Sequence, residues 1–106
     1  MSAHPSPQDI IRSFIGLLTV APRGEDSFSG PPQPGGVGRV FGGQVIAQAL
    51  QAAQATAPEG MAAHSLHAYF LRGGTEGLNT HYDISRDLDG RSFANRRVIA
   101  RQEGAI

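Results

Sequence analysis

The first hydrophobic positions along the chain recur at helical spacing. Residues 6–9 (SPQD) supply a capping serine, a proline suited to a first helical turn and an acidic residue near the positive end of the helix dipole. The apolar residues that follow share one helical face: Ile10, Ile11, Phe14, Leu17 and Leu18. The pattern predicts an amphipathic helix that ends near residues 20–21. Residues 22–38, rich in Pro and Gly, are expected to be mostly loop, with one short strand near residues 26–30.

Residues 41–57 show a different pattern. No residue between Arg39 and Glu59 is charged, and apolar residues occupy more than one helical face. The segment opens with two glycines and carries a polar stripe that consists of Gln44, Gln48 and Gln51. A surface helix would carry charges on its outer face, and a membrane-spanning helix would not carry four glutamines. This segment is predicted to be a buried helix wrapped by other structure.

The remaining sequence predicts antiparallel strands. Residues 64–72 alternate so that one face can pack on the helix. Residues 80–88 and 92–101 flank Asp89-Gly90, a strong hairpin signal. A turn centred there places Asp83 opposite Arg96, an opposite-charge pair that favours this register. The fold class is α+β: an antiparallel meander curls around a buried helix, and a turn at residues 103–104 would lead into another strand. Residues 1–24 form the lead-in, and residues 25–106 form the wrapped domain.

Composition narrows the classes of protein. The formal net charge is zero and 40% of the residues are hydrophobic, so disorder and nucleic-acid binding are not indicated. The absence of cysteine excludes disulfides, thiolate metal sites and a cysteine nucleophile. The N-terminal residues do not resemble a secretory signal, and no apolar run is long enough to span a membrane. We therefore expect a cytoplasmic protein without a membrane or nucleic-acid partner.

Three stretches together resemble the first half of the type II (TesB-type) acyl-CoA thioesterases: residues 39–45 (RVFGGQV), 64–72 (HSLHAYFLR) and 89–98 (DGRSFANRRV). The resemblance runs from about the first helix to residue 106. It implies a double hotdog fold, in which two tandem repeats each wrap a sheet around a helix; this chain would be one incomplete repeat. The resemblance also implies hydrolysis of acyl-CoA to free fatty acid and coenzyme A, with no metal or organic cofactor. The family's water-activating acidic residue, hydroxyl residue and glutamine lie in the second repeat, so the isolated chain is expected to be inactive or weakly active.

The start of the buried helix holds the first candidates for substrate binding. Unpaired N–H groups at Gly42 and Gly43 could polarise a thioester carbonyl and hold the developing oxyanion. Alternatively, the two glycines only allow a tight turn into a closely packed helix. Gln44, in the first turn, could orient water or the carbonyl, although a glutamine there can also simply cap the helix.

The second group of candidates is polar or charged. His64 could act as a general base, or it could be a histidine hydrogen-bonded at the edge of the core. Arg72 could bind the phosphates of coenzyme A, because guanidinium groups suit phosphate oxygens. Arg91, Arg96 and Arg97 could serve the same purpose, although such arginines could instead only add surface charge or pair with Asp83 across the strands. Arg96 and Arg97 are neighbours on a strand and point to opposite faces, so at most one of the two serves a given site. His64 and His67 also point to opposite faces of the predicted strand, and no metal site is expected.

Two functions are compatible with the sequence. The chain is either the N-terminal half of an acyl-CoA thioesterase or a non-catalytic hotdog module for acyl-chain binding or dimerisation. A hydratase is disfavoured because residues 31–41 contain no Asp/His pair. The expected partners are an acyl-CoA substrate and either the C-terminal hotdog repeat or another copy of the chain. A single repeat exposes a sheet edge, so a homo-oligomer is expected.

Overall fold

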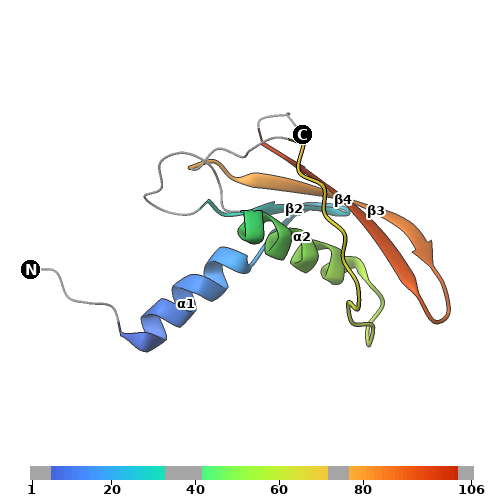
Figure 1. Ribbon diagram of the computed structural model, residues 1–106, viewed down its shortest axis with the longest axis horizontal. Coiled ribbons are helices and arrows are strands. Elements are labelled where there is room, and N and C mark those ends of the chain that lie inside the picture. Colours follow the sequence, from blue (N-terminus) through green and yellow to red (C-terminus); the bar gives the residue numbers. More distant parts are fainter. Residues whose placement is uncertain (1–5, 33–41, 72–76, 103–106) are drawn as a thin grey trace, which may run out of the picture.

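A computed structural model describes residues 6–32, 42–71 and 77–102. Four strands form one antiparallel sheet in the order β1-β2-β3-β4, and helix α2 lies across one face of it (Figure 1). The elements are, in chain order, α1 (Pro7–Leu18), β1 (Ala21–Gly24), β2 (Ser27–Gly30), α2 (Gly42–Thr56), β3 (Thr80–Asp89) and β4 (Ala94–Arg101). Sheet and helix form the α+β arrangement that the sequence predicts.

Helix α1 begins as predicted. The Ser6 hydroxyl accepts a hydrogen bond from the Asp9 amide at 3.1 Å, and the Asp9 carboxylate accepts one from the Ser6 amide at 3.3 Å. This reciprocal capping satisfies two amides at the helix start. The helix ends at Leu18, two residues before the predicted end. It extends away from the body, on the side opposite the β3–β4 hairpin, and most of its apolar face is exposed (Figure 1).

The segment expected to be mostly loop contains two strands. The predicted strand near residues 26–30 is confirmed as β2, whereas β1, four residues long, was not expected. The two strands are joined by a tight turn in which Asp26 has φ of 53°, a left-handed conformation that Asp tolerates better than most residues. Arg86 holds this turn because its guanidinium donates to both Asp26 carboxylate oxygens, at 2.8–3.1 Å.

The core lies between the sheet and α2. It consists of Phe28, Ala52, Tyr82 and Ile84, with five partly buried residues packed against them. The face of α2 that meets the sheet carries Gln44, Gln48, Ala52 and Thr56, at helical spacing of four. The prediction of a buried helix is confirmed on this face. The prediction that other structure wraps the helix on all sides is wrong for the described residues, because Gln51 is exposed and the opposite face borders an open cavity.

Strands β3 and β4 confirm the predicted hairpin, but the predicted register is wrong. Asp83 pairs with Ile99, and Arg96 lies opposite Arg86. The chain reverses two residues later than expected, where the Gly90 amide donates to the Phe93 carbonyl at 2.7 Å. Gly90 does not adopt the positive φ that a two-residue Asp-Gly turn needs, so the sequence signal did not fix the turn. A bulge between Arg86 and Leu88 then moves the pairing back by one residue, which offsets only part of this shift.

The strand predicted for residues 64–72 is also absent from the described part of the chain. Residues 62–70 have no regular secondary structure and are exposed, and Arg72 lies outside the described residues. No described backbone group forms a hydrogen bond with residues 62–71. Alternation predicts the two faces of a strand, but a strand also needs a neighbour that satisfies its backbone groups.

Candidate functional site

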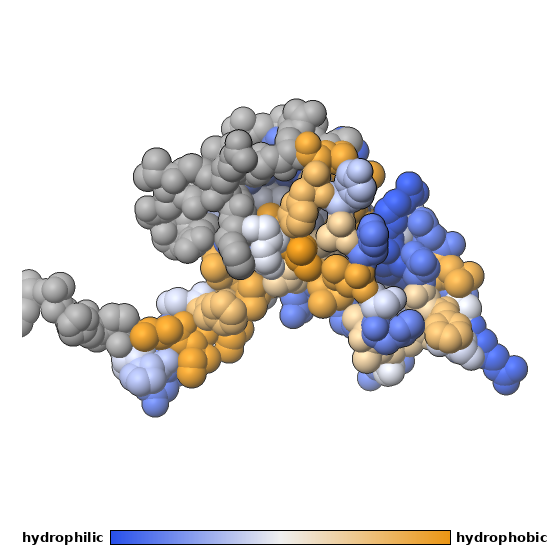
Figure 2. Space-filling model, viewed as in Figure 1, coloured by the Kyte–Doolittle hydropathy of each residue, from blue (hydrophilic) through white to orange (hydrophobic). Residues whose placement is uncertain are grey.

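A large open cavity borders the side of α2 that does not meet the sheet. Its volume is about 1590 Å³, and it lies between α2, residues 57–71 and strand β4. Apolar residues gather in the middle of this side of the molecule, between the polar β3–β4 hairpin and α1 (Figure 2). Helix α2 supplies the apolar wall of the cavity with Val45, Ile46, Ala49, Leu50 and Ala53. A wall of this kind suits a hydrocarbon chain better than a polar ligand.

The N-terminus of α2 reaches the cavity through Gly42. A Cβ added at Gly42 would lie 3.2 Å from the Phe70 ring, so a larger residue there would push the ring aside. Gly43 is exposed. The first amides of any helix lack partners within it, so this end of α2 presents donors where the cavity begins. Helix α2 has no acidic residue in its first turn that would compete for them.

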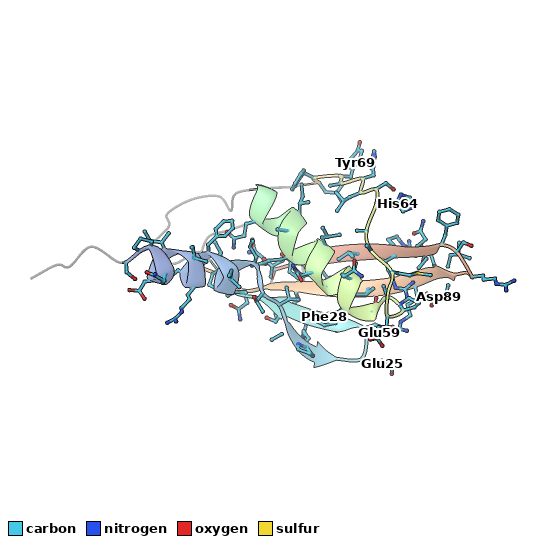
Figure 3. All side chains as sticks on the ribbon, turned by 90° about the horizontal axis from the view of Figure 1, so that it is seen from below. Glu25, Phe28, Glu59, His64, Tyr69 and Asp89 are labelled. Carbon is cyan, nitrogen blue, oxygen red and sulfur yellow. The ribbon has the colours of Figure 1, made fainter. Side chains whose placement is uncertain are left out.

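His64 lines the same cavity at a different place. Its ring meets the Phe93 ring edge-on, with centroids 5.8 Å apart, so it lies beside the β3–β4 hairpin, whereas Phe70 lies beside Gly42. His64 and Tyr69 lie on the same exposed segment (Figure 3). The structure brings Gly42 and His64 to one cavity but records no contact between them. The imidazole of His64 is open to water there.

Gln44 points toward the sheet and does not line the cavity. Its side chain is buried, and its Nε2 donates to the Pro31 carbonyl at 3.3 Å. Its Oε1 is buried without a partner among the described residues. This position gives Gln44 a packing role, and a role in substrate binding stays a prediction. The predicted role of Arg72 also stays a prediction, because Arg72 lies outside the described residues.

Arg96 has a role that sequence reasoning missed. Its side chain is 6% exposed and donates to the Thr56 hydroxyl at 2.8 Å, to the Thr56 carbonyl at 3.0 Å and to the Asp89 carboxylate at 2.7 Å. The last turn of α2 carries no basic residue, so Arg96 brings a cation from β4 to the negative end of the helix dipole. Arg97 points to the opposite face, as predicted, and is 65% exposed.

The part of the chain that the structure describes lacks both a cluster of metal-ligating side chains and a membrane-spanning helix. They contain no group of three or more His, Cys, Asp or Glu side chains that could hold a metal ion. None of the helices in the described part of the chain is long and apolar enough to cross a bilayer. The cavity offers an apolar wall, a helix N-terminus and two exposed imidazoles, those of His64 and His67.

Comparison with known proteins gives consistent matches. Residues 30–106 match the family model described as "Acyl-CoA thioesterase N-terminal domain". The chain is 43% identical over 94 residues to "Acyl-CoA thioesterase 2" of Haemophilus influenzae, a match that covers 89% of this chain and 33% of that protein. It is 41% identical over 88 residues to human "Acyl-coenzyme A thioesterase 8", with 83% of this chain and 28% of that protein covered.

A solved structure agrees with these matches. The tesB protein of Mycobacterium avium subs paratuberculosis superimposes with a TM-score of 0.79 at 37% sequence identity, covering 85% of this chain and 36% of that one. The chain thus spans about a third or less of the curated relatives named above. The likeness to a solved structure supports the hotdog fold, and the family model covers most of the sequence. The chain belongs to the acyl-CoA thioesterase N-terminal domain family.

Proposed function

We propose that this chain is the N-terminal part of an acyl-CoA thioesterase, in which water cleaves the thioester to give a free fatty acid and coenzyme A. The observation that carries the proposal is the match of residues 30–106 to the thioesterase N-terminal domain, supported by two relatives above 40% identity that are named acyl-CoA thioesterases. The cavity is consistent with this chemistry, because the outward face of α2 offers an apolar wall to an acyl group.

The proposal assigns a role to each candidate residue. The amides at Gly42 and Gly43 polarise the thioester carbonyl and hold the oxyanion that forms when water attacks. His64 accepts a proton from the attacking water. In this proposal Gln44 turns away from the Pro31 carbonyl to orient the thioester carbonyl, and Arg72 binds a phosphate of coenzyme A. The main catalytic groups lie in the polypeptide that follows this domain, so the isolated chain has weak activity or none. The proposed enzyme needs no cofactor.

Thiol release from acyl-CoA tests the proposal. Because the chain contains no cysteine, a thiol-reactive dye reports only the coenzyme A that the reaction releases, as long as the added polypeptide is also made cysteine-free. The chain alone should be compared with a chimera in which residues 1–106 precede the polypeptide that follows the matched region in the Haemophilus relative. Butyryl-, decanoyl- and palmitoyl-CoA serve as substrates. We expect the chimera to hydrolyse at least one of them much faster than the chain alone.

Two histidine variants of the chimera test the role of His64. The change His64→Ala should lower kcat by about 10²–10⁴-fold if His64 is a general base. His67→Ala is the matched control, because His67 lies three residues away on the same exposed segment, and it should leave kcat close to that of the parent chimera. Equal kcat values for the two variants would remove His64 from the mechanism. A folded chimera that binds these thioesters without cleaving any of them would instead support the non-catalytic module.

A further inference from the structure

A second, smaller cavity lies where the end of α1 meets the sheet. Its volume is about 460 Å³, within the roughly 300–1,000 Å³ that is usual for small-molecule pockets. Val20, Ala21 and Pro31 contribute apolar surface to its wall, and Ser29 and Asn79 contribute polar groups. None of the described side chains that line it is charged. The cavity therefore suits an uncharged, largely apolar part of a ligand.

The strand registers connect this cavity to a row of polar side chains. Ser29 of β2 pairs with His81 of β3, and His81 pairs with Arg101 of β4. Tyr82, the neighbour of His81, belongs to the core, so the alternation of a strand places the row on the face of the sheet away from α2. Side chains directly opposite on neighbouring strands have Cβ atoms about 4.5–5.5 Å apart. A hydroxyl, an imidazole and a guanidinium thus lie side by side, and the hydroxyl residue also lines the cavity.

Two nitrogens in this row lack a partner. Nδ1 of His81 and Nε of Arg101 are buried, and neither forms a hydrogen bond within the described residues. The Asp83 carboxylate lies 3.6 Å from Nε of Arg101, which is too long for a hydrogen bond, and its other oxygen accepts from the Ser27 hydroxyl at 3.0 Å. Buried polar groups are nearly always hydrogen-bonded in native proteins. The row therefore favours an added acceptor.

The row and the cavity together restrict the chemistry of the ligand. A carboxylate can accept from two neighbouring donors, and it forms strong hydrogen bonds with a guanidinium. An imidazole carries an N–H donor even when it is neutral. Inorganic phosphate would satisfy the row and leave the apolar wall uncovered, whereas an aliphatic alcohol would cover the wall and leave the guanidinium unpaired. A fatty acid has both parts.

We propose that the Ser29–His81–Arg101 row and the adjoining cavity bind a free fatty acid of short or medium chain length. Its carboxylate accepts from His81 and Arg101, and its hydrocarbon chain lies against Val20 and Pro31. The small volume, compared with about 1590 Å³ beside α2, limits the length of the chain. A fatty acid is the product of the proposed hydrolysis, so the site lets the product act back on the enzyme. That regulatory meaning rests on the proposed function, whereas the binding itself does not.

Titration of the chain with sodium octanoate tests the proposal without any assay of hydrolysis. Octanoate should shift the amide NMR resonances of Ala21, Ser29 and His81, and the three shifts should follow one dissociation constant. Octanol lacks the carboxylate and acetate lacks the long chain. Each should therefore bind at this site at least about tenfold more weakly than octanoate.

Two arginines of β4 provide matched variants. Both border the larger cavity, because β4 lies at the edge of the sheet, but Arg97 pairs with Ser85 and Arg101 pairs with His81. Arg101→Gln should raise the dissociation constant of octanoate at least about tenfold, whereas Arg97→Gln should leave it within about twofold. Ala21 is exposed and lines the smaller cavity, so Ala21→Leu narrows the cavity and should also weaken the binding of octanoate.

Three results would overturn the proposal. In the first, octanoate shifts only amides of α2 and residues 57–71, which would place the fatty acid in the larger cavity and leave the proposed function intact. In the second, octanol binds as tightly as octanoate. In the third, the Arg101 and Arg97 variants have equal dissociation constants. Octanoate binding at the row, together with a folded chimera that hydrolyses no thioester, would uphold the site and count against the proposed function alone.

Discussion

Among the described glycines, Gly30 has the closest neighbours. A methyl group added there would overlap Oε1 of Gln48 and approach the Tyr82 ring at 3.0 Å. Gln48 cannot easily turn away, because it accepts from the Tyr82 hydroxyl at 2.6 Å and donates to the carbonyls of Leu17 at 2.6 Å and Pro31 at 3.0 Å. Burial raises the pKa of the Tyr82 hydroxyl, so it stays the donor in this network even in alkaline solution.

The change Gly30→Ala should therefore destabilise the fold. We expect a loss of about 2–4 kcal/mol in the free energy of unfolding, because the added methyl overpacks the core and breaks hydrogen bonds of a buried amide. Gly24→Ala is the control, because its added Cβ would meet only the Ser27 Cβ at an ordinary 3.9 Å, and it should change stability by no more than about 0.5 kcal/mol. Urea unfolding of both variants measures the difference. Similar midpoints for the two variants would show that Gln48 moves freely.

The inward position of Gln48 could not be predicted from the sequence. A stripe of glutamines at helical spacing is equally compatible with a wet face and with a buried, fully bonded face, and the pattern contains no information about Tyr82 or the carbonyl groups that satisfy Gln48. The same stripe divides in the structure: Gln44 and Gln48 are buried, while Gln51 is exposed. The absence of charged residues along α2 did predict that the helix is buried, because a surface helix would carry charges on its outer face.

Among the elements, the C-terminus of α2 and the β3–β4 hairpin are joined by Arg96. Its buried guanidinium contacts Thr56 at the end of the helix and Asp89 at the end of β3. Arg96→Met should lower the free energy of unfolding by about 2–4 kcal/mol, because it leaves the Thr56 carbonyl and Asp89 without their donor; the partial exposure of Asp89 keeps the cost below that of a fully buried pair. Thermal unfolding measures this loss.

The adjacent arginine is the control for this prediction. Arg97 lies on the same strand, but its side chain is 65% exposed. Water therefore screens its ion pair with Asp87, at 3.4 Å, and Arg97→Met should change the free energy of unfolding by less than about 1 kcal/mol. Amide exchange in the last turn of α2 should speed up in the Arg96 variant and not in the Arg97 variant. Equal unfolding temperatures for the two variants would contradict the role of Arg96 as a link between helix and hairpin.

The hairpin also shows how far local sequence signals reach. Asp89-Gly90 correctly placed a reversal between two strands, yet the pairing of Asp83 with Arg96 was wrong because the turn lies two residues later. The bulge between Arg86 and Leu88 offsets this shift by only one residue. Asp83 instead accepts from the Ser27 hydroxyl at 3.0 Å and lies 3.6 Å from Arg101. An exposed pair of opposite charges is compatible with several strand registers, whereas the buried hydrogen bonds from Arg96 to Thr56 of α2 are compatible with one. Such long-range contacts are not visible in a local pattern.

At the scale of the whole molecule, the sequence predicted more than its local details suggest. The order of a capped helix, an uncharged helix and a hairpin, together with three motifs in register, predicted the family and fold that the comparisons confirm. The candidate site was less predictable. Gly42 and His64 do line one cavity, but Gln44 does not, and the strand expected at residues 64–72 has no partner among the described residues. These failures share a cause, because each depends on atoms that lie far away in the sequence or outside this domain.

The projecting helix α1 gives a last prediction, about self-association. Its apolar face exposes Ile10, Ile11, Phe14 and Ile15 by 55–60% each. The helix projects from the body, so two copies can bury these side chains against each other without entering the cavity (Figure 1). Its charged side chains, Asp9 and Arg12, cancel, which favours a protein surface over an anionic membrane as the partner. The chain should therefore form dimers or larger oligomers in sedimentation equilibrium.

Paired substitutions distinguish α1 from the cavity beside α2 as the source of this association. Ile11→Ser with Phe14→Ser removes apolar side chains that are 57% and 60% exposed, and it should raise the dissociation constant by at least about tenfold, because burial of each such side chain contributes on the order of 1 kcal/mol or more. Leu66→Ser with Phe70→Ser removes side chains that are 51% and 57% exposed beside the cavity, and it should leave the constant nearly unchanged, because these side chains do not belong to α1. A larger effect from the Leu66 and Phe70 pair would place the self-association at the cavity, and a monodisperse monomer of the parent chain would exclude both surfaces.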